Sequence, residues 1–235
     1  MSETSLPTYR LDGNVAVITM DDGKANVFSN ASLEVLEGLL DQVAADEARA
    51  LVLVGRPGKF SAGFDLAEMT SSVEGMRALV VRGCRWWMRL YGLGIPTVAA
   101  CTGHALAGGA LTLLSCDVRV GADVQSKIGL NEVAIGMTLP IFAVELARDR
   151  LAPAHLLKAV TGQVYDPNGA CEVGFLDRVV PEDALLDEAL AEARALAERN
   201  TTAYGGTKKN LRGEMIERCL AGVEADMAGM AGPKV

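Results

Sequence analysis

Two apolar runs of strand length, each followed directly by a segment of small residues, constrain the fold of this chain most. Residues 50–54 read ALVLV, and residues 97–101 read TVAAC. Continuous apolar runs of this length are typical of strands buried on both faces, as in parallel sheets covered by helices. Helical patterns alternate with them, from Ser29 or Asn30 to Val43 and from about Val73 to Leu93. The sequence therefore predicts an α/β fold.

The rest of the chain predicts further elements of both kinds. Strands are expected over residues 14–20, 117–121 and 127–130, and helices over residues 140–150 and 153–160. Residues 55–63 are expected to form a loop, and residues 102–110 a turn. After Pro181 the composition becomes rich in Ala and Glu, with two helices separated near Asn200. We therefore expect a core over residues 1–180 and a C-terminal helical region over residues 181–235.

Composition and charge exclude several classes of function. The chain has 235 residues, with 22 Lys and Arg against 30 Asp and Glu, which gives a net charge of −8. This balance disfavours nucleic acid as a partner, although a small anionic ligand needs only local donors. No apolar run is long enough for a membrane span and no secretory signal is evident, so we expect a cytoplasmic protein. Five scattered cysteines predict reduced, mostly buried thiols, and two histidines without HExxH spacing predict no metal site.

Two segments of small residues carry the first functional signal. They are FSAGFDL at residues 60–66 and TGHALAGGA at residues 102–110, each directly after a predicted buried strand. Where such a strand gives way to a helix, backbone N–H groups are free and the helix dipole favours negative charge. Two converging N–H groups would form an oxyanion hole, although either segment alone is ordinary turn chemistry. The spacing around Gly58 is too short for a phosphate-binding P-loop, and no GxSxG motif occurs.

The order of the motifs resembles the enoyl-CoA hydratase/isomerase (crotonase) superfamily. FSAGFDL and TGHALAGGA are followed by CDVRV at residues 116–120 and by GLNEVAIGMTLP at residues 129–140. The resemblance runs in order from about Tyr9 to the C-terminal helices. It implies an α/β, crotonase-like spiral of ββα units with a C-terminal helical region, assembled as a homotrimer or a dimer of trimers. It also implies an acyl-CoA thioester as ligand, with coenzyme A as part of the substrate and no separate cofactor.

The same resemblance implies roles for particular residues. The two oxyanion-hole amides map onto Phe64 and Gly108, and Ala107 replaces the first glycine of the family's triplet. The loop KANV at residues 24–27 aligns with the segment that lines coenzyme A. The residues expected along the ligand are Lys24, Ala25, Val27, Ala62, Asp65, Leu66 and Leu111. Lys24 could contact a phosphate, and a solvated loop lysine is an equal alternative. Lys208, Lys209 and Arg212 are interpreted as a solvated helix face, with phosphate contacts as the alternative.

The chain departs from the pattern of typical hydratases of the family at one catalytic position. These hydratases carry two glutamates, at the positions of Leu111 and Glu132 here. Hydration needs an activated water and a proton donor, whereas moving a double bond from β,γ to α,β needs one group that takes a proton at Cα and returns it at Cγ. Glu132 as the sole base therefore favours isomerase chemistry over efficient hydration. Its apolar flanks predict a partly buried carboxyl group with a raised pKa.

Alternatives remain open at this point. A non-catalytic acyl-CoA carrier or sensor would also explain the missing glutamate, although a buried, unpaired Glu132 argues against it. Glu145 is a reserve candidate for the acid or base, with an exposed helix residue as its alternative. A hydrolase or dehalogenase is disfavoured because the segment around Leu139 and Pro140 is apolar. His104, within the second motif, is expected to be a packing residue. Trp86 and Trp87 are also expected to pack, with one of them bordering the acyl pocket.

Overall fold

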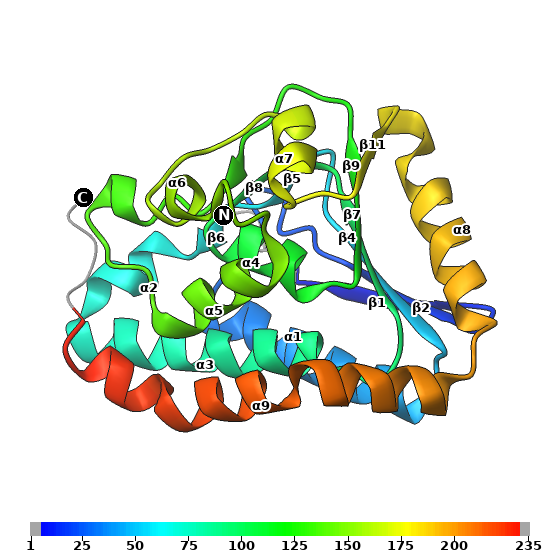
Figure 1. Cartoon of the computed structure of the whole chain (residues 1–235), viewed down its shortest axis with the longest axis horizontal. Helices are drawn as coiled ribbons and strands as arrows, with labels where there is room; N and C mark the ends of the chain where they lie inside the picture. Colours follow the sequence, from blue (N-terminus) through cyan, green and yellow to red (C-terminus); the bar gives the residue numbers. More distant parts are fainter. Residues whose placement is uncertain (1–5, 231–235) are drawn as a thin grey trace.

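A six-stranded sheet forms the frame of the computed structural model, which describes residues 6–230 (Figure 1). Its strand order is β1-β2-β4-β7-β9-β11, and every neighbouring pair is parallel except the antiparallel pair β1–β2. The bounds are β1 (Thr8–Asp12), β2 (Val15–Thr19), β4 (Ala50–Val54), β7 (Thr97–Cys101), β9 (Val118–Ala122) and β11 (Arg178–Val180). The two apolar runs are thus central strands with the predicted bounds.

The central strands are apolar throughout because both faces of the sheet are covered. Every residue of β4 and β7 is buried. Side chains alternate between two apolar clusters, so that Leu51 and Leu53 face one cluster while Ala50 and Val52 face the other. The second cluster includes side chains of α8 (Leu185–Ala197), which lies on that face of the sheet (Figure 1).

Two smaller sheets include strands in segments that the sequence predicts to be loop and turn, and one strand within the strand predicted over residues 127–130. One consists of β10 (Ile128–Gly129), β8 (Gly103–Leu106) and β5 (Gly58–Ser61), and the other pairs β3 (Val27–Phe28) with β6 (Gly63–Phe64). The predictions for residues 55–63 and 102–110 are therefore wrong over these strands. Their glycines conceal the strand pattern, yet they allow close packing: a Cβ on Gly103 would lie 2.2 Å from the carbonyl carbon of Gly58.

The chain repeatedly runs from a strand of the large sheet to a short strand and then to a helix. The helices of these units are α1 (Asn30–Ala45), α2 (Leu66–Ser71) with α3 (Val73–Tyr91), α4 (Gly108–Ser115), and α5 (Ile141–Arg150) after the 3₁₀ turn η1 (Val133–Ile135). Short helices α6 (Leu156–Val160) and α7 (Pro167–Val173) lead to β11. This succession confirms the predicted spiral of ββα units.

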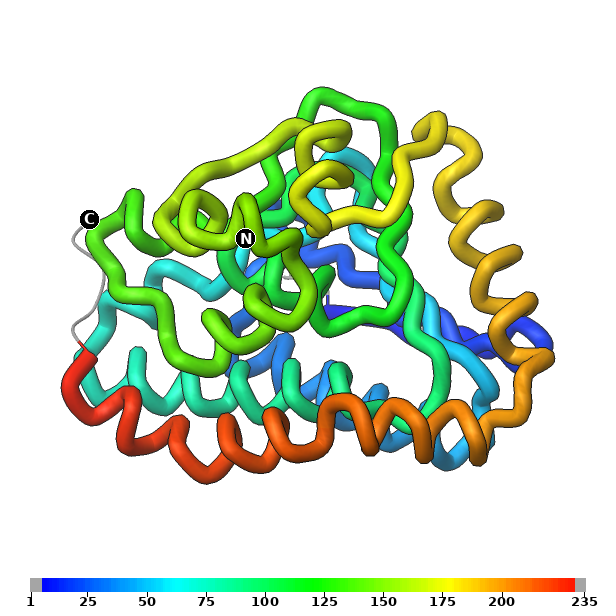
Figure 2. Tube along the Cα trace, viewed as in Figure 1, coloured from blue at the N-terminus to red at the C-terminus, as the bar shows by residue number. Residues whose placement is uncertain are grey.

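The C-terminal part of the chain forms a 3₁₀ turn and two helices, as expected. After η2 (Glu182–Ala184) and α8, the chain enters α9 (Thr201–Ala228), which begins where Asn200 Oδ1 accepts a hydrogen bond of 2.9 Å from the Ala203 N–H group. Helix α9 runs alongside α3, and its buried residues Cys219, Val223 and Met227 join the main apolar cluster (Figure 2). The domain boundary near residue 181 stays a prediction.

Two basic residues of α9 are buried, which corrects the interpretation of a solvated face. Lys208 and Arg212 are each 5% exposed, whereas Lys209 is exposed. Asp117 accepts hydrogen bonds from Lys208 Nζ at 2.8 Å and from Arg212 Nη1 at 2.7 Å. Burial raises the pKa of Asp117, but the two cations outweigh this effect and lower it. The sequence could not show this because Asp117 lies about ninety residues earlier.

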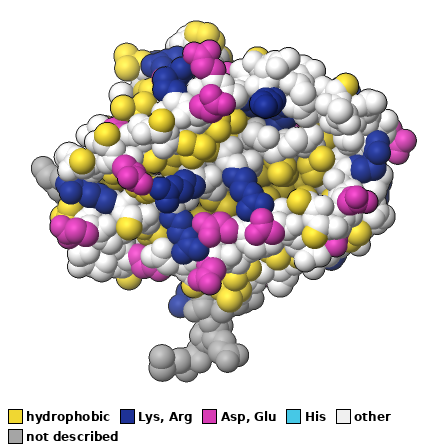
Figure 3. All heavy atoms as spheres, turned by 90° about the horizontal axis from the view of Figure 1, so that it is seen from below, with side chains coloured by type: hydrophobic (Ala, Val, Ile, Leu, Met, Phe, Trp, Pro, Cys, Tyr) yellow, Lys and Arg dark blue, Asp and Glu magenta, His cyan; other side chains and the backbone are white. Residues whose placement is uncertain are grey.

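The face of the molecule that carries α9 shows charges of both signs between apolar side chains (Figure 3). Two of its ion pairs, Arg85–Glu224 and Arg218–Glu145, join α9 to α3 and α5 at 2.7 and 2.8 Å. Within residues 6–230, no helix has both the length and the apolar character that crossing a membrane requires. All five cysteines are free, and all except the half-buried Cys171 are buried, as predicted.

Candidate active site

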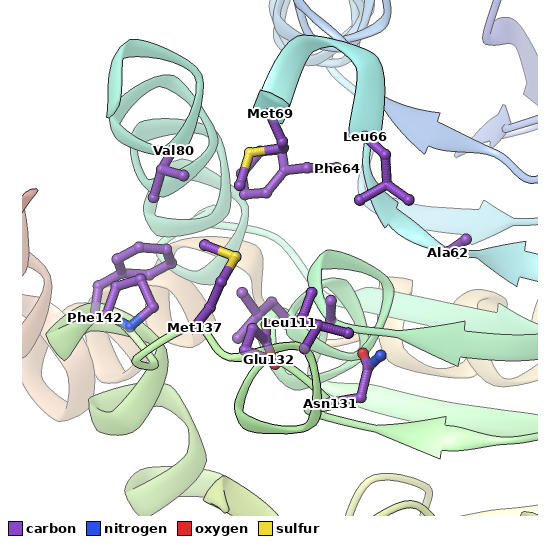
Figure 4. A pocket seen from close by; sticks show the side chains of 13 residues that line it. Ala62, Phe64, Leu66, Met69, Val80, Leu111, Asn131, Glu132, Met137 and Phe142 are labelled. Atoms are coloured by element: carbon purple, nitrogen blue, oxygen red, sulfur yellow. The ribbon is translucent and has the colours of Figure 1, made fainter. Parts of the chain in front are cut away.

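A cavity of about 170 Å³ lies between α2 and α3 on one side and α4 with the segment after β10 on the other (Figure 4). Its wall is formed by Ala62, Phe64, Leu66, Met69, Val80, Ala107, Leu111, Asn131, Glu132, Ile135, Met137, Pro140 and Phe142. Every one of these lining side chains except Asn131 and Glu132 is apolar. The cavity therefore suits a largely apolar ligand whose polar centre contacts a single acidic group.

Glu132 is the acidic group of this wall. It immediately precedes η1, and its carbonyl oxygen accepts hydrogen bonds from the N–H groups of Ile135 and Met137 at 3.1 and 3.0 Å. The side chain is 8% exposed, and within residues 6–230 its Oε2 has no hydrogen-bond partner. Burial raises the pKa of the Glu132 carboxyl group to about 7. A carboxyl group with such a pKa can both take up and release a proton near neutral pH.

The segments that carry Phe64 and Gly108 meet beside the cavity. Phe64 ends β6, and Gly108 begins α4, where the first N–H groups of a helix lack partners within that helix. A Cβ built on Gly63 would lie 3.1 Å from the Gly108 nitrogen and 2.9 Å from the Ala107 Cβ. Phe64 and Ala107 both line the cavity. The structure thus brings together the two segments for which the sequence predicts an oxyanion hole.

The other residues expected along the ligand are divided between the cavity and its surroundings. Ala62, Leu66 and Leu111 line the cavity. Ala25 lies beside it, because its carbonyl oxygen accepts a hydrogen bond of 3.0 Å from the Ala62 N–H group. Lys24 is exposed on the same loop.

Two further predicted residues line a neighbouring cavity of about 380 Å³. Val27 and Asp65 belong to its wall, together with Asp21 and Asp22. Asp65 also caps α2, because its Oδ1 accepts a hydrogen bond of 3.1 Å from the Glu68 N–H group. The carboxylates of this wall make it unsuitable for a phosphate group.

Sequence reasoning missed most of the apolar wall and one polar residue. The missed lining residues are Met69, Val80, Asn131, Ile135, Met137, Pro140 and Phe142. Apolar residues on helices cannot be told from core residues by pattern alone. Asn131 could have been noticed because it directly precedes Glu132. Its Oδ1 is buried and has no hydrogen-bond partner within the described chain.

Several candidate residues lie outside the cavity wall. Glu145 is paired with Arg148 and Arg218, and its side chain is only 16% exposed, so the expectation of an exposed residue is wrong. His104 is half-buried, and its Nδ1 accepts a hydrogen bond of 3.0 Å from the Lys127 N–H group. Both tryptophans are buried, as predicted, but neither belongs to the cavity wall, so the expectation that one borders it is wrong. In the described chain, no three His, Cys, Asp or Glu side chains are grouped to hold a metal ion.

Comparison with known proteins gives consistent results over nearly the whole chain. The family model for enoyl-CoA hydratase/isomerase matches residues 10–230. The crystal structure of an enoyl-CoA hydratase/isomerase family protein from Pseudomonas syringae has a TM-score of 0.94 and 39% identity, covering 98% of this chain and 100% of that one.

Curated relatives include proteins of both activities. Human mitochondrial enoyl-CoA delta isomerase 1 is 31% identical over 218 residues, 91% of this chain and 72% of that protein. The short-chain-enoyl-CoA hydratase of Clostridium acetobutylicum is 30% identical over 220 residues, 89% of this chain and 83% of that protein. The chain therefore belongs to the enoyl-CoA hydratase/isomerase (crotonase) family of enzymes.

Proposed function

We propose that this enzyme moves the double bond of a 3-enoyl-CoA thioester to the conjugated 2-position. The observation that carries the proposal is Glu132, the one carboxyl group that residues 6–230 contribute to a cavity wall that is otherwise apolar apart from Asn131. Similarity alone does not choose the reaction, because the isomerase and the hydratase named above are 31% and 30% identical to this chain. The side chain at position 111 supports isomerisation, because Leu111 is apolar and 2% exposed and so can neither hold a water nor donate a proton.

In the proposed reaction a single proton moves along the substrate. The Glu132 carboxylate takes the proton from Cα, and the electron pair of the C–H bond forms the enolate of the thioester. The protonated Glu132 then returns the proton to Cγ while the enolate collapses, so that the double bond joins Cα and Cβ. The substrate and the product are therefore isomers, and Glu132 returns to its starting ionisation state. A pKa of about 7 for Glu132 suits both steps near neutral pH.

The enolate oxygen would be held by the backbone N–H groups of Phe64 and Gly108. Such donors act on charge that develops in the transition state, and removing one costs of order 10²–10³ in rate in other enzymes. The contact between Gly63 and the Gly108 nitrogen supports this assignment, because it places the two segments side by side. Ala62 and Leu66 are exposed at the rim of the cavity, where the coenzyme A arm would leave it. Ala25 and Lys24 would contact the coenzyme A arm further from the cavity.

The assembly state belongs to the same proposal. Family resemblance suggests a homotrimer or a dimer of trimers. Leu157 on α6 is 76% exposed, and a subunit interface would remove such an apolar side chain from water. Light scattering of the purified protein would distinguish three subunits from six or one. The cytoplasmic location also stays a prediction.

The test compares two substrates by the absorbance of the conjugated thioester. We expect the absorbance to rise with a 3-enoyl-CoA and to fall slowly, or not at all, with crotonyl-CoA. Glu132→Gln should lower the isomerisation rate by about 10²–10⁴-fold. Rapid hydration of crotonyl-CoA without isomerisation would contradict the proposal. Saturable acyl-CoA binding without turnover of either substrate would favour the carrier instead.

A further inference from the structure

We infer that Trp87 is a positioning residue that holds the Phe64 and Gly108 backbone amides at a fixed separation. The inference rests on the proposed function, because it concerns the proposed oxyanion hole. Trp87 does not line the cavity and is fully buried in α3. It therefore acts through the two residues that it contacts.

The first contact of Trp87 is with Phe64. The two rings lie 5.3 Å apart, edge to face, at an interplanar angle of 69°. Gly83, one turn earlier on α3, leaves the space for this contact, because a Cβ there would lie 2.6 Å from Phe64 Cζ and 2.8 Å from Trp87 Cζ3. The Phe64 ring thus packs between Gly83 and the indole of Trp87. This fixes the short strand β6, which is only two residues long.

The second contact of Trp87 is with Gly108, and it has two parts. A Cβ on Gly108 would lie 2.9 Å from Trp87 Cζ2, so the indole packs directly on the glycine backbone. Trp87 Nε1 also donates a hydrogen bond of 3.0 Å to Thr112 Oγ1, and the Thr112 hydroxyl donates one of 2.9 Å to the Gly108 carbonyl oxygen. One indole therefore contacts both residues whose amides are the proposed donors: the side chain of Phe64 with its ring, and Gly108 with its ring and through two hydrogen bonds.

The backbone needs such support at this place. Gly108 and Gly109 are consecutive glycines, which have more conformational freedom than any other residue, and Ala107 before them has a positive φ of 48°. The indole is itself held from behind, by Phe142 stacked at 5.9 Å and by Phe28 edge-on at 5.4 Å. A rigid aromatic group thus restrains two segments that are weakly restrained by their own sequence.

Two substitutions interrupt the arrangement in different ways. Thr112→Val keeps the size of the side chain but removes both hydrogen bonds, and Thr112→Ser keeps the hydroxyl. Trp87→Phe removes the N–H group and the second ring. Trp86→Phe is the matched control: Trp86 is a buried neighbour on the same helix whose Nε1 has no partner in the described chain, and its ring lies edge to face with Trp87 at 6.3 Å. This substitution thus tests whether any loss of packing on the indole has the same effect. Unfolding midpoints of all four variants establish that each one is folded.

The measurements are the kinetics of isomerisation and the infrared frequency of the thioester carbonyl in a bound, non-isomerising saturated acyl-CoA. We expect Thr112→Val and Trp87→Phe to lower kcat by about 10- to 100-fold with little change in KM, since a small misplacement of catalytic groups has this effect. Both should move the carbonyl frequency back toward that of the free thioester. Thr112→Ser should recover most of the loss seen in Thr112→Val, and Trp86→Phe should leave the frequency unchanged.

Three outcomes would overturn the inference. The first is an unchanged frequency and kcat in both Thr112→Val and Trp87→Phe. The second is an equal loss in Trp86→Phe, which would indicate general packing. The third is that the wild-type protein binds the thioester without shifting its carbonyl frequency, which would also refute the proposed oxyanion hole. A shifted frequency without isomerisation would refute the proposed reaction alone, and the variants would still test Trp87 by their spectra.

Discussion

Glu132 is a carboxyl group whose burial affects both catalysis and stability. The group is 8% exposed, and at Oε2 it receives no hydrogen bond within residues 6–230. Burial without compensation disfavours the ionised form, which is the form that a base needs. The protein therefore loses some stability in order to keep a carboxylate ready to accept a proton. Two measurements separate these effects.

The first measurement is the pH dependence of isomerisation. The reaction begins with ionised Glu132, whose pKa is about 7 because the group is buried. We expect kcat/KM to rise about tenfold between pH 6 and pH 8 and then to level off, since kcat/KM reports ionisation of the free enzyme. A profile that is flat over this range would show that another group is the base.

The second measurement is the stability of Glu132→Gln as a function of pH. The folded pKa of about 7 lies above the ordinary value of 4.5, so the stabilising effect of protonated Glu132 is complete below pH 4.5 and is lost as the pH rises through 7. The loss amounts to about 3 kcal/mol. Relative to wild type, Glu132→Gln should gain about this much free energy of unfolding between pH 4.5 and pH 8.5 in urea titrations. Glu145→Gln, which removes an ion-paired carboxylate, should show no such gain.

At the scale of single elements, α4 begins with an unfavourable backbone conformation. Ala107, the residue before the helix, has φ 48° and ψ −117°, a region that favours glycine. This conformation turns the chain at Ala107, between the end of β8 and the start of α4 beside β6. Such conformations cost of order 1–3 kcal/mol and persist where the surroundings enforce them.

Replacing Ala107 with glycine should relieve this cost. We expect Ala107→Gly to raise the free energy of unfolding by about 1 kcal/mol, after allowance for the greater freedom of glycine in the unfolded chain. Ala110→Gly, three residues further on and inside the helix, is the control and should lower it by about 1 kcal/mol. Chemical denaturation of both variants checks the prediction. Equal destabilisation by both changes would show that Ala107 is unstrained.

The same elements show what can be predicted from sequence. Strands β4 and β7 have the predicted bounds because burial on both faces leaves a continuous apolar run. The start of α1 was also predicted to within one residue, at Ser29 or Asn30, and the Ser29 side chain caps the helix by accepting a hydrogen bond from the Ser32 N–H group. The strands β5 and β8 could not be found, because their glycines serve close packing between strands and show no alternation.

At the scale of the whole molecule, Asp117 joins the C-terminal helix to the large sheet. It directly precedes β9, and besides Lys208 and Arg212 it accepts hydrogen bonds from the Tyr204 hydroxyl and the Thr97 N–H group, both at 3.0 Å. A buried charge cluster of this kind is costly to break at one member, because the remaining charges stay buried without compensation.

Removing the central carboxylate should therefore loosen α9. We expect Asp117→Asn to lower the free energy of unfolding by about 3–5 kcal/mol. Asp41→Asn is the control: Asp41 pairs with Arg89 at 2.6 Å but is 74% exposed, and its loss should cost less than about 1 kcal/mol. Urea denaturation compares the two variants. A small effect of Asp117→Asn would mean that solvent enters the cluster and screens its charges.

The candidate site was more predictable than its surroundings for a physical reason. Phe64, Gly108 and Glu132 were proposed because they lie in short motifs that resemble those of the family, each close to the end of a strand. The rest of the cavity wall comes from helices, where Met69, Val80 and Phe142 follow the same apolar pattern as core residues. The burial of Lys208 was equally hidden, since its partner is remote in the sequence.

The position of α9 also has a consequence for the newly made chain. All described residues that line the cavity lie between Ala62 and Phe142, whereas α9, which braces α3 and α5, is made later. On the ribosome, the cavity wall is thus complete in sequence well before its brace emerges. Until then the apolar sides of α3 and α5 that later contact α9 face water. While residues 143–228 are being made, we therefore expect the nascent chain to expose apolar surface that favours aggregation.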